Sequence, residues 1–223
     1  IMQAYQIKIE FIDSKPLIWR RVIMPADATF NRLNDVIQTV TNFRSGYPYH
    51  DYHLYEFNLP DENIRVTNSE EAYEEHKYYQ NNKQEMQEKI NSMPDEFDEF
   101  KEQQLKELEI EVKKPSYIKI DEYLKKYEEL DYVYDFGDYW QIKIILEKEI
   151  DDYDKGYPTL IDGANDAPPE DVGGLPGFYD FLEKYNDPEH PEHEFNKSWA
   201  NDQNYREYNE ERINESLKSI KYK

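Results

Sequence analysis

Histidine and carboxylate side chains gather in four short segments. These are YHLYEF (52–57), YVYDFGDYW (132–140), PPEDVGGLPG (168–177) and DPEHPEH (187–193). Imidazoles and carboxylates can bind divalent ions or act as an acid/base pair. With the motif tryptophan, the candidate site residues are His53, Asp135, Asp138, Trp140, Glu170, Asp171, His190 and His193.

The same residues also suit structural roles, and we favour that interpretation. Asp135 and Asp138 can accept hydrogen bonds from the amides of their own turn, with Gly137 expected at positive φ. His190 and His193 lie in a proline-rich loop, unlike the paired histidines on the helix of a zincin. We therefore expect no catalytic residue, no cofactor and no tightly bound metal.

The elements that would position these side chains follow from hydrophobic periodicity. Tyr5, Ile7, Ile9 and Phe11 alternate with polar residues, as in a half-buried strand. Apolar residues at helical spacing follow a capping Asp27 or Thr29. The remaining expected elements are strands over 17–24 and 53–59, a helical hairpin over 69–111, a helix over 119–130, a β-hairpin over 130–134 and 140–146, and helices over 178–185 and 203–223.

This order of elements predicts an α+β fold, with a mainly antiparallel sheet, packed helices and an inserted acidic helical hairpin. At 223 residues we expect one domain spanning 1–223, with 69–111 as the insertion and 203–223 as a C-terminal helix. Cysteine is absent, which excludes disulfides and thiolate sites. The mean hydropathy is low, at −1.06. No apolar run is long enough to span a bilayer, so we expect a cytoplasmic protein without membrane contact.

The net charge of −22 is concentrated in two blocks. Residues 69–111 hold fourteen acidic and five basic residues, and residues 151–194 hold thirteen and two. Such surfaces repel nucleic acid and attract basic proteins, so we expect a protein partner with a basic surface and no direct nucleic-acid binding. The candidate partner-binding acids are Glu70, Glu71, Glu74 and Glu75.

With PLIWRRVIMP (16–25) added, the ordered motifs resemble the plasmid pRi Orf-three-like family, also labelled a TnpR-type passenger protein of insertion elements. The resemblance implies an α+β fold and occurrence on mobile elements of bacteria and archaea, with no established biochemical activity. This chain has Tyr55 and Gln141 where the family often has histidine. It has Ala167 where the family usually has cysteine.

The only compact basic-aromatic element is Trp19-Arg20-Arg21. A phosphate contact is one interpretation. We favour an arginine that stacks on Trp19 or pairs with the carboxylates of residues 132–138.

Together these features predict a non-enzymatic, acidic protein-binding module of mobile-element origin. A sharper form is an inhibitor that mimics nucleic acid and blocks a basic channel of a host defence nuclease. The alternatives are a metal-dependent hydrolase using the His/Asp/Glu set and a DNA-associated regulator. The partner's identity and the oligomeric state stay open.

Overall fold

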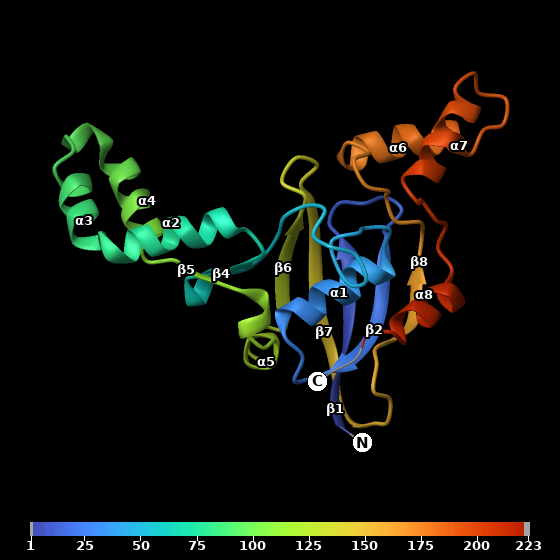
Figure 1. Ribbon diagram of the computed structural model, residues 1–223, viewed down its shortest axis with the longest axis horizontal. Coiled ribbons are helices and arrows are strands. Elements are labelled where there is room, and N and C mark those ends of the chain that lie inside the picture. Colours follow the sequence, from blue (N-terminus) through green and yellow to red (C-terminus); the bar gives the residue numbers. More distant parts are fainter. Residues whose placement is uncertain (1, 221–223) are drawn as a thin grey trace.

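An eight-stranded sheet is the frame of the molecule (Figure 1). The computed structural model describes residues 2–220. The strand order is β5-β4-β3-β6-β7-β1-β2-β8, and all neighbours are antiparallel except β4 and β5. The strands are β1 (Met2–Phe11), β2 (Trp19–Pro25), β3 (Tyr55–Leu59), β4 (Ile64–Thr67), β5 (Glu111–Lys113), β6 (Glu129–Tyr134), β7 (Trp140–Tyr153) and β8 (Thr159–Ala164).

Eight α-helices accompany the sheet within the described residues. Together with the mainly antiparallel strands, they confirm the predicted α+β class. The helices are α1 (Phe30–Val40), α2 (Glu70–Asn81), α3 (Lys83–Asn91), α4 (Asp98–Leu108), α5 (Asp121–Tyr127), α6 (Gly174–Tyr185), α7 (His193–Asp202) and α8 (Glu210–Leu217), with 3-10 turns η1 (Pro60–Glu62), η2 (Asp95–Phe97) and η3 (Pro115–Tyr117).

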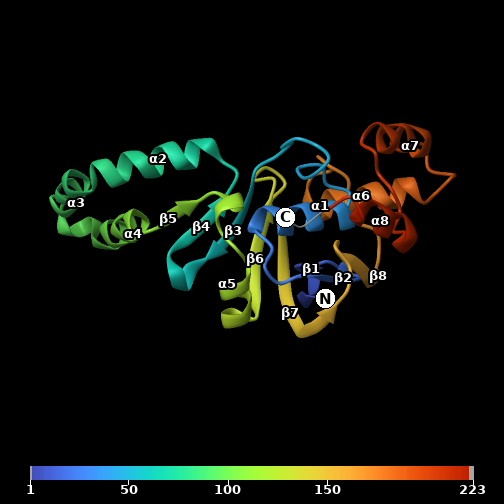
Figure 2. The ribbon, with the colours of Figure 1, turned by 60° about the horizontal axis from the view of Figure 1, so that its bottom comes forward.

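The hydrophobic core lies between the sheet and α1, which crosses the strands in Figures 1 and 2. The alternating residues of β1 point into this core, and Tyr5, Ile7 and Ile9 are fully buried. Helix α1 begins where expected, because the Thr29 side chain accepts a hydrogen bond from the Arg32 amide at 3.2 Å. The alternating apolar residues of β1 and the apolar face of α1 therefore pack into the same core.

The Trp19-Arg20-Arg21 element places its two arginines on opposite faces of β2, because adjacent strand residues alternate. The Arg21 guanidinium lies 4.9 Å from the centroid of the Trp19 ring, as the stacking alternative predicts. Its ion pair at 2.6 Å is with Glu147 of β7, not with the carboxylates of residues 132–138. Arg20 points the other way and is 2% exposed.

The acidic insertion forms an arm that projects from the β4–β5 edge of the sheet, as both views show (Figures 1 and 2). It contains three α-helices, α2 to α4, and its last predicted residue, Glu111, already belongs to β5. Ile90 and Leu108 are its only buried helical residues among those described. The arm therefore leaves most of its charged surface free.

The last predicted helix, 203–223, corresponds to α8 over Glu210–Leu217. Residues 221–223 of that prediction lie outside the described residues. Among the helices of residues 2–220, none combines the length and the apolar character required to cross a bilayer.

Candidate metal centre

Strand pairing brings the first two candidate residues together at one end of the sheet. In the β3–β6 ladder, Tyr55 lies opposite Tyr134. The ladder continues one step further, because the Asp135 amide donates to the Leu54 carbonyl at 2.9 Å. His53, just before β3, and Asp135, just after β6, therefore lie side by side although 82 positions separate them in the sequence.

A third segment, the loop between β8 and α6, brings Glu170 and Asp171 to the same place. The Gly173 amide of this loop donates to the Asp138 carboxylate at 3.0 Å, which ties the loop to the β6–β7 turn. Gly173 and Gly174 have φ values of 96° and 72°, a conformation that glycine adopts without steric cost. Helix α6 can therefore begin directly after the loop.

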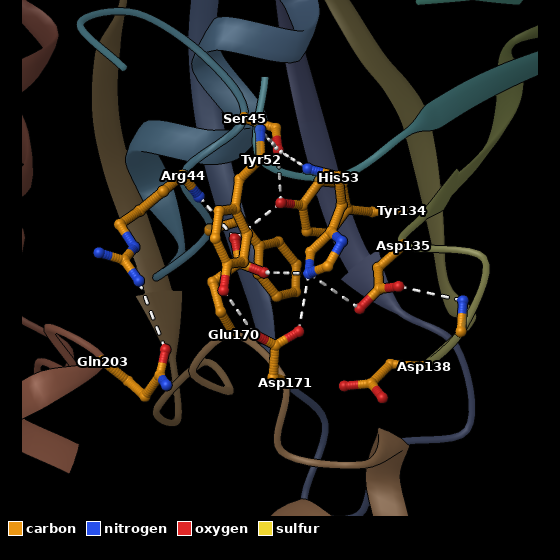
Figure 3. Close-up of polar contacts among 12 residues, drawn as sticks. Arg44, Ser45, Tyr52, His53, Tyr134, Asp135, Asp138, Glu170, Asp171 and Gln203 are labelled. Carbon is orange, nitrogen blue, oxygen red and sulfur yellow. Dashed lines mark hydrogen bonds and ion pairs between the residues drawn. The ribbon is translucent and has the colours of Figure 1, made fainter. Parts of the chain in front are cut away.

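The four side chains converge on the His53 imidazole (Figure 3). Its Nε2 atom lies 2.7 Å from Asp171 Oδ1, 3.5 Å from Asp135 Oδ2 and 3.8 Å from Glu170 Oε2. One potential ligand atom from each of the four residues lies within 4.8 Å of the other three. Ligands about 2.1 Å from an octahedral ion are separated by about 3 to 4 Å, so the set is close to the spacing that a cation requires.

Glu170 is the most unusual member of the cluster, because its side chain is completely buried. Its Oε1 atom accepts hydrogen bonds from the Tyr134 hydroxyl and the Arg44 amide, both at 2.7 Å. Its Oε2 atom, which faces His53, has no hydrogen-bond partner among the described residues. Burial raises the pKa of Glu170, against the opposing effects of its two donors.

A hydrogen-bond network around Ser45 fixes these side chains. Its Oγ atom accepts from the amides of Tyr52 and His53 at 2.9 and 2.7 Å. Because the Tyr134 hydroxyl donates to Glu170, Ser45 is left to donate to Tyr134, at 2.6 Å. The Tyr52 hydroxyl donates to Asp171 at 2.7 Å, and this bond raises the pKa of Tyr52. Sequence reasoning did not select Ser45, Tyr52 or Tyr134 for this site.

The electrostatics of the cluster favour a cation. Three carboxylates meet there, and no lysine or arginine in residues 2–220 forms an ion pair with Asp135, Glu170 or Asp171. Carboxylates at this spacing repel one another unless a proton or a metal ion lies between them. The His53 and Asp171 side chains are 27% and 40% exposed, so water can reach the cluster from one side.

The other predicted site residues lie apart from the four or hold them in place. Asp138 anchors the Gly173 loop, and Trp140 is buried against Phe11 and other core rings. His193 is the first residue of α7 rather than part of the predicted loop, and it bonds through Nδ1 to the Lys184 carbonyl at 2.9 Å. His190 accepts from the Glu192 amide at 3.0 Å.

The turn chemistry differs from the prediction at one position, because Gly137 does not have positive φ. The left-handed residues are Asp135 at 58° and Tyr139 at 56°, which flank the turn. The Asp135 carboxylate accepts from the Gly137 amide at 3.0 Å, and this short bond fixes the turn without a glycine at positive φ. The prediction for Gly137 was wrong because the aspartate adopts the left-handed conformation instead.

The three departures from the family pattern do not take part in the cluster. Tyr55 is buried beside Tyr132, with ring centroids 6.0 Å apart. Gln141 is exposed in β7, and Ala167 is buried in the β8–α6 loop. The four-residue set is complete without an imidazole or a thiol at these positions.

Comparison with known proteins gives consistent results across the chain. Residues 3–216 match the family described as plasmid pRiA4b ORF-3-like protein. An uncharacterized protein of Sinorhizobium fredii, y4hQ, is 24% identical over 92% of this chain and 84% of its own length. A crystal structure of a protein of unknown function from Methanosarcina mazei, MM3350, is similar with a TM-score of 0.66 and 25% identity, covering 96% of this chain and 97% of the other.

Proposed function

The chain belongs to the plasmid pRiA4b ORF-3-like family, and for this member we propose the function of a divalent-metal-dependent hydrolase. His53, Asp135, Glu170 and Asp171 would be its metal ligands. The observation that carries the proposal is the Oε2 atom of Glu170, which is buried and without a hydrogen-bond partner in the described chain. A buried carboxylate oxygen without a partner is costly, and a bound cation removes that cost.

The ligand set favours Mn²⁺ among the common divalent ions. Three carboxylates supply the hard oxygen donors that Mg²⁺, Ca²⁺ and Mn²⁺ prefer, whereas the imidazole of His53 disfavours Ca²⁺ and Mg²⁺. Four protein ligands leave two positions of an octahedral ion for water or substrate. Those positions would face the solvent beside Asp171, and an open coordination position is typical of catalytic rather than structural sites.

The ion would activate water, and the residues around it would hold its ligands in position. A bound divalent ion lowers the pKa of its water and supplies a nucleophile at neutral pH. Tyr52 holds Asp171 in place through its hydroxyl, and Tyr134 holds Glu170. Ligands fixed in this way keep their geometry when the ion binds, and such supporting bonds strengthen metal sites.

Titration of the metal-free protein with Mn²⁺, followed by calorimetry, is expected to give one site per chain. His53→Ala should weaken this binding by about 100-fold or more, because it removes a ligand and its orienting contacts. His190→Ala is the matched control and should leave binding unchanged, since His190 lies in another loop. Hydrolysis of p-nitrophenyl esters should require the metal and be lost in His53→Ala. A stoichiometry of zero would remove the proposal and support the sequence-based expectation of no bound metal.

The projecting arm supports a second candidate function, the acidic protein-binding module. Glu70, Glu71, Glu74 and Glu75 are all exposed on α2 and occupy adjacent positions on its surface. Exposed aromatic rings accompany the acids on the arm, namely Tyr78 at 59%, Phe97 at 48% and Phe100 at 49%. Acidic side chains beside exposed rings suit a partner with a basic surface and apolar contacts.

A charge-reversal experiment tests this second candidate on a partner captured from the native host. Changing Glu70, Glu71, Glu74 and Glu75 to lysine should lower the association rate by about 10-fold or more, with little change in dissociation. The control reverses four exposed acids around α8 and gives the same net charge: Glu207, Glu210, Glu211 and Glu215. Equal losses in the two variants would show that total charge matters and that the arm is not the binding surface.

A further inference from the structure

A pocket of about 260 Å³ lies between the loop after α1 and helix α8, and its charge is opposite to that of the protein. Three arginines line it: Arg44, Arg206 and Arg212. The chain has seven arginines, 49 acidic residues and a net charge of −22. No aspartate or glutamate contributes to the pocket wall in the described chain. An acid-free pocket that collects three of seven arginines is therefore a local exception to the surface of this protein.

The three guanidinium groups are not neutralised within the described residues. None of them forms an ion pair with a carboxylate of residues 2–220, whereas Arg21, Arg32 and Arg65 all do. Arg44 bonds Gln203 at 3.4 Å, and its buried Nε has no hydrogen-bond partner in that range. Among the described residues, the Arg212 guanidinium bonds only the Glu207 carbonyl, at 3.1 Å. The charges therefore remain available to an anion.

Two of the three arginines, Arg206 and Arg212, lie close together. Burial, together with the charge of nearby Arg206, lowers the pKa of Arg212. Like charges held together repel, and a bound anion relieves that repulsion. Hydroxyl groups suited to the remaining oxygens of such an anion lie in the same wall, namely those of Thr39, Ser216 and Ser219.

We propose that this pocket binds the phosphate group of a small organic molecule. Arginine donors match phosphate geometry, and several arginines can share one phosphate through its separate oxygens. Tyr47 and Tyr49 also line the pocket and are 50% and 55% exposed, so their rings can contact the organic part of the ligand. The volume limits the ligand to a small molecule, and the acidic surface repels a long polyanion. The pocket shares Arg44 with the proposed metal centre, through the amide that donates to Glu170 and a guanidinium 5.5 Å from the centroid of the Tyr52 ring. Arg206 and Arg212 belong to the pocket alone, so the test rests on them.

Calorimetric titration in metal-free buffer tests the proposal, with inorganic phosphate and adenosine monophosphate as probes. Both should bind one site per chain, and adenosine monophosphate should bind at least as tightly as phosphate. Arg206→Ala and Arg212→Ala should each weaken binding by about 10- to 100-fold, the usual effect of a lost charged hydrogen bond. Arg65→Ala, which removes an arginine paired with Glu56, is the matched control and should bind like the unchanged protein.

Several results would overturn the proposal. One is the absence of phosphate binding at millimolar concentration by the unchanged, folded protein. Another is equal binding by the pocket variants and the Arg65→Ala control. Tighter binding of a short single-stranded oligonucleotide than of adenosine monophosphate would replace the small-molecule ligand with nucleic acid. Because the buffer contains no divalent metal, none of these results bears on the His53 cluster.

Discussion

Replacing Glu170 with glutamine is expected to stabilise the metal-free protein at neutral pH and to abolish its stabilisation by Mn²⁺. The buried Oε2 atom of the charged side chain has no hydrogen-bond partner in the described chain and faces two other carboxylates. Glutamine removes the charge and keeps an oxygen for Tyr134 and Arg44. We expect the free energy of unfolding to rise by about 1–3 kcal/mol, the usual cost of an unsatisfied buried polar group.

The free energy of unfolding should depend on pH differently in the unchanged protein and in Glu170→Gln. The pKa of Glu170 is raised by burial, so the folded state holds the proton more tightly than the unfolded state. The free energy of unfolding should therefore fall as pH rises from about 4.5 through the raised folded pKa, and stay low above it. Glu170→Gln should lose this part of the decline. Asp35, whose pKa burial also raises, contributes the same slope to both proteins, so their difference isolates Glu170.

Metal should reverse the order of stability. Saturating Mn²⁺ stabilises a protein that binds it by about 4.1 kcal/mol at 1,000 times the dissociation constant, which exceeds the gain expected from Glu170→Gln. The unchanged protein should show this gain in thermal unfolding, and Glu170→Gln should not. Glu189→Gln, an exposed glutamate in another loop, is the control and should behave like the unchanged protein. A Glu170→Gln variant that keeps the full response to Mn²⁺ would exclude Glu170 as a ligand.

Local sequence patterns correctly predicted the elements that are specified by residues close together in the sequence. The alternation of β1 and the stripe of α1 are local, and the structure has both. Strand β4 was missed because its partners are β3 and, across the whole arm, β5. Helix α7 was also missed, because it begins at His193, the last residue of the proline-rich segment that predicts a loop. Long-range pairing and tertiary contacts decide these elements, and no short window of sequence contains that information.

The candidate site shows the same division. The motifs contained all four members of the cluster, because histidine and carboxylate residues in turns can be recognised as candidate ligands from their residue type. They could not show that His53 and Asp135 meet, since this follows from the pairing of Tyr55 with Tyr134. Nor could they show that Glu170 is buried and His190 lies elsewhere. The sequence showed which residues could be ligands, but it did not show which of them are buried or which of them meet in the folded chain.

The two neighbouring arginines of β2 are expected to differ sharply in their effect on stability. Arg20 is buried, and its guanidinium donates to the carbonyls of Val40 at 2.9 Å, Trp19 at 2.8 Å and Ala164 at 3.1 Å. It also lies 4.2 Å from the centroid of the Tyr208 ring. Burial lowers the pKa of Arg20 to about 10, so the group stays charged at neutral pH. One side chain thus joins β2, α1 and β8.

Arg20→Met should lower the free energy of unfolding by about 3–5 kcal/mol, because it removes three buried hydrogen bonds to carbonyls and the cation–π contact. Arg21→Met is the matched control one position away. Its side chain is 25% exposed and pairs with Glu147, so the same change should cost about 1 kcal/mol or less. Urea denaturation of the two variants measures the difference directly. Equal losses would show that the buried guanidinium is not what holds the edge strand β8 and helix α1 to the sheet.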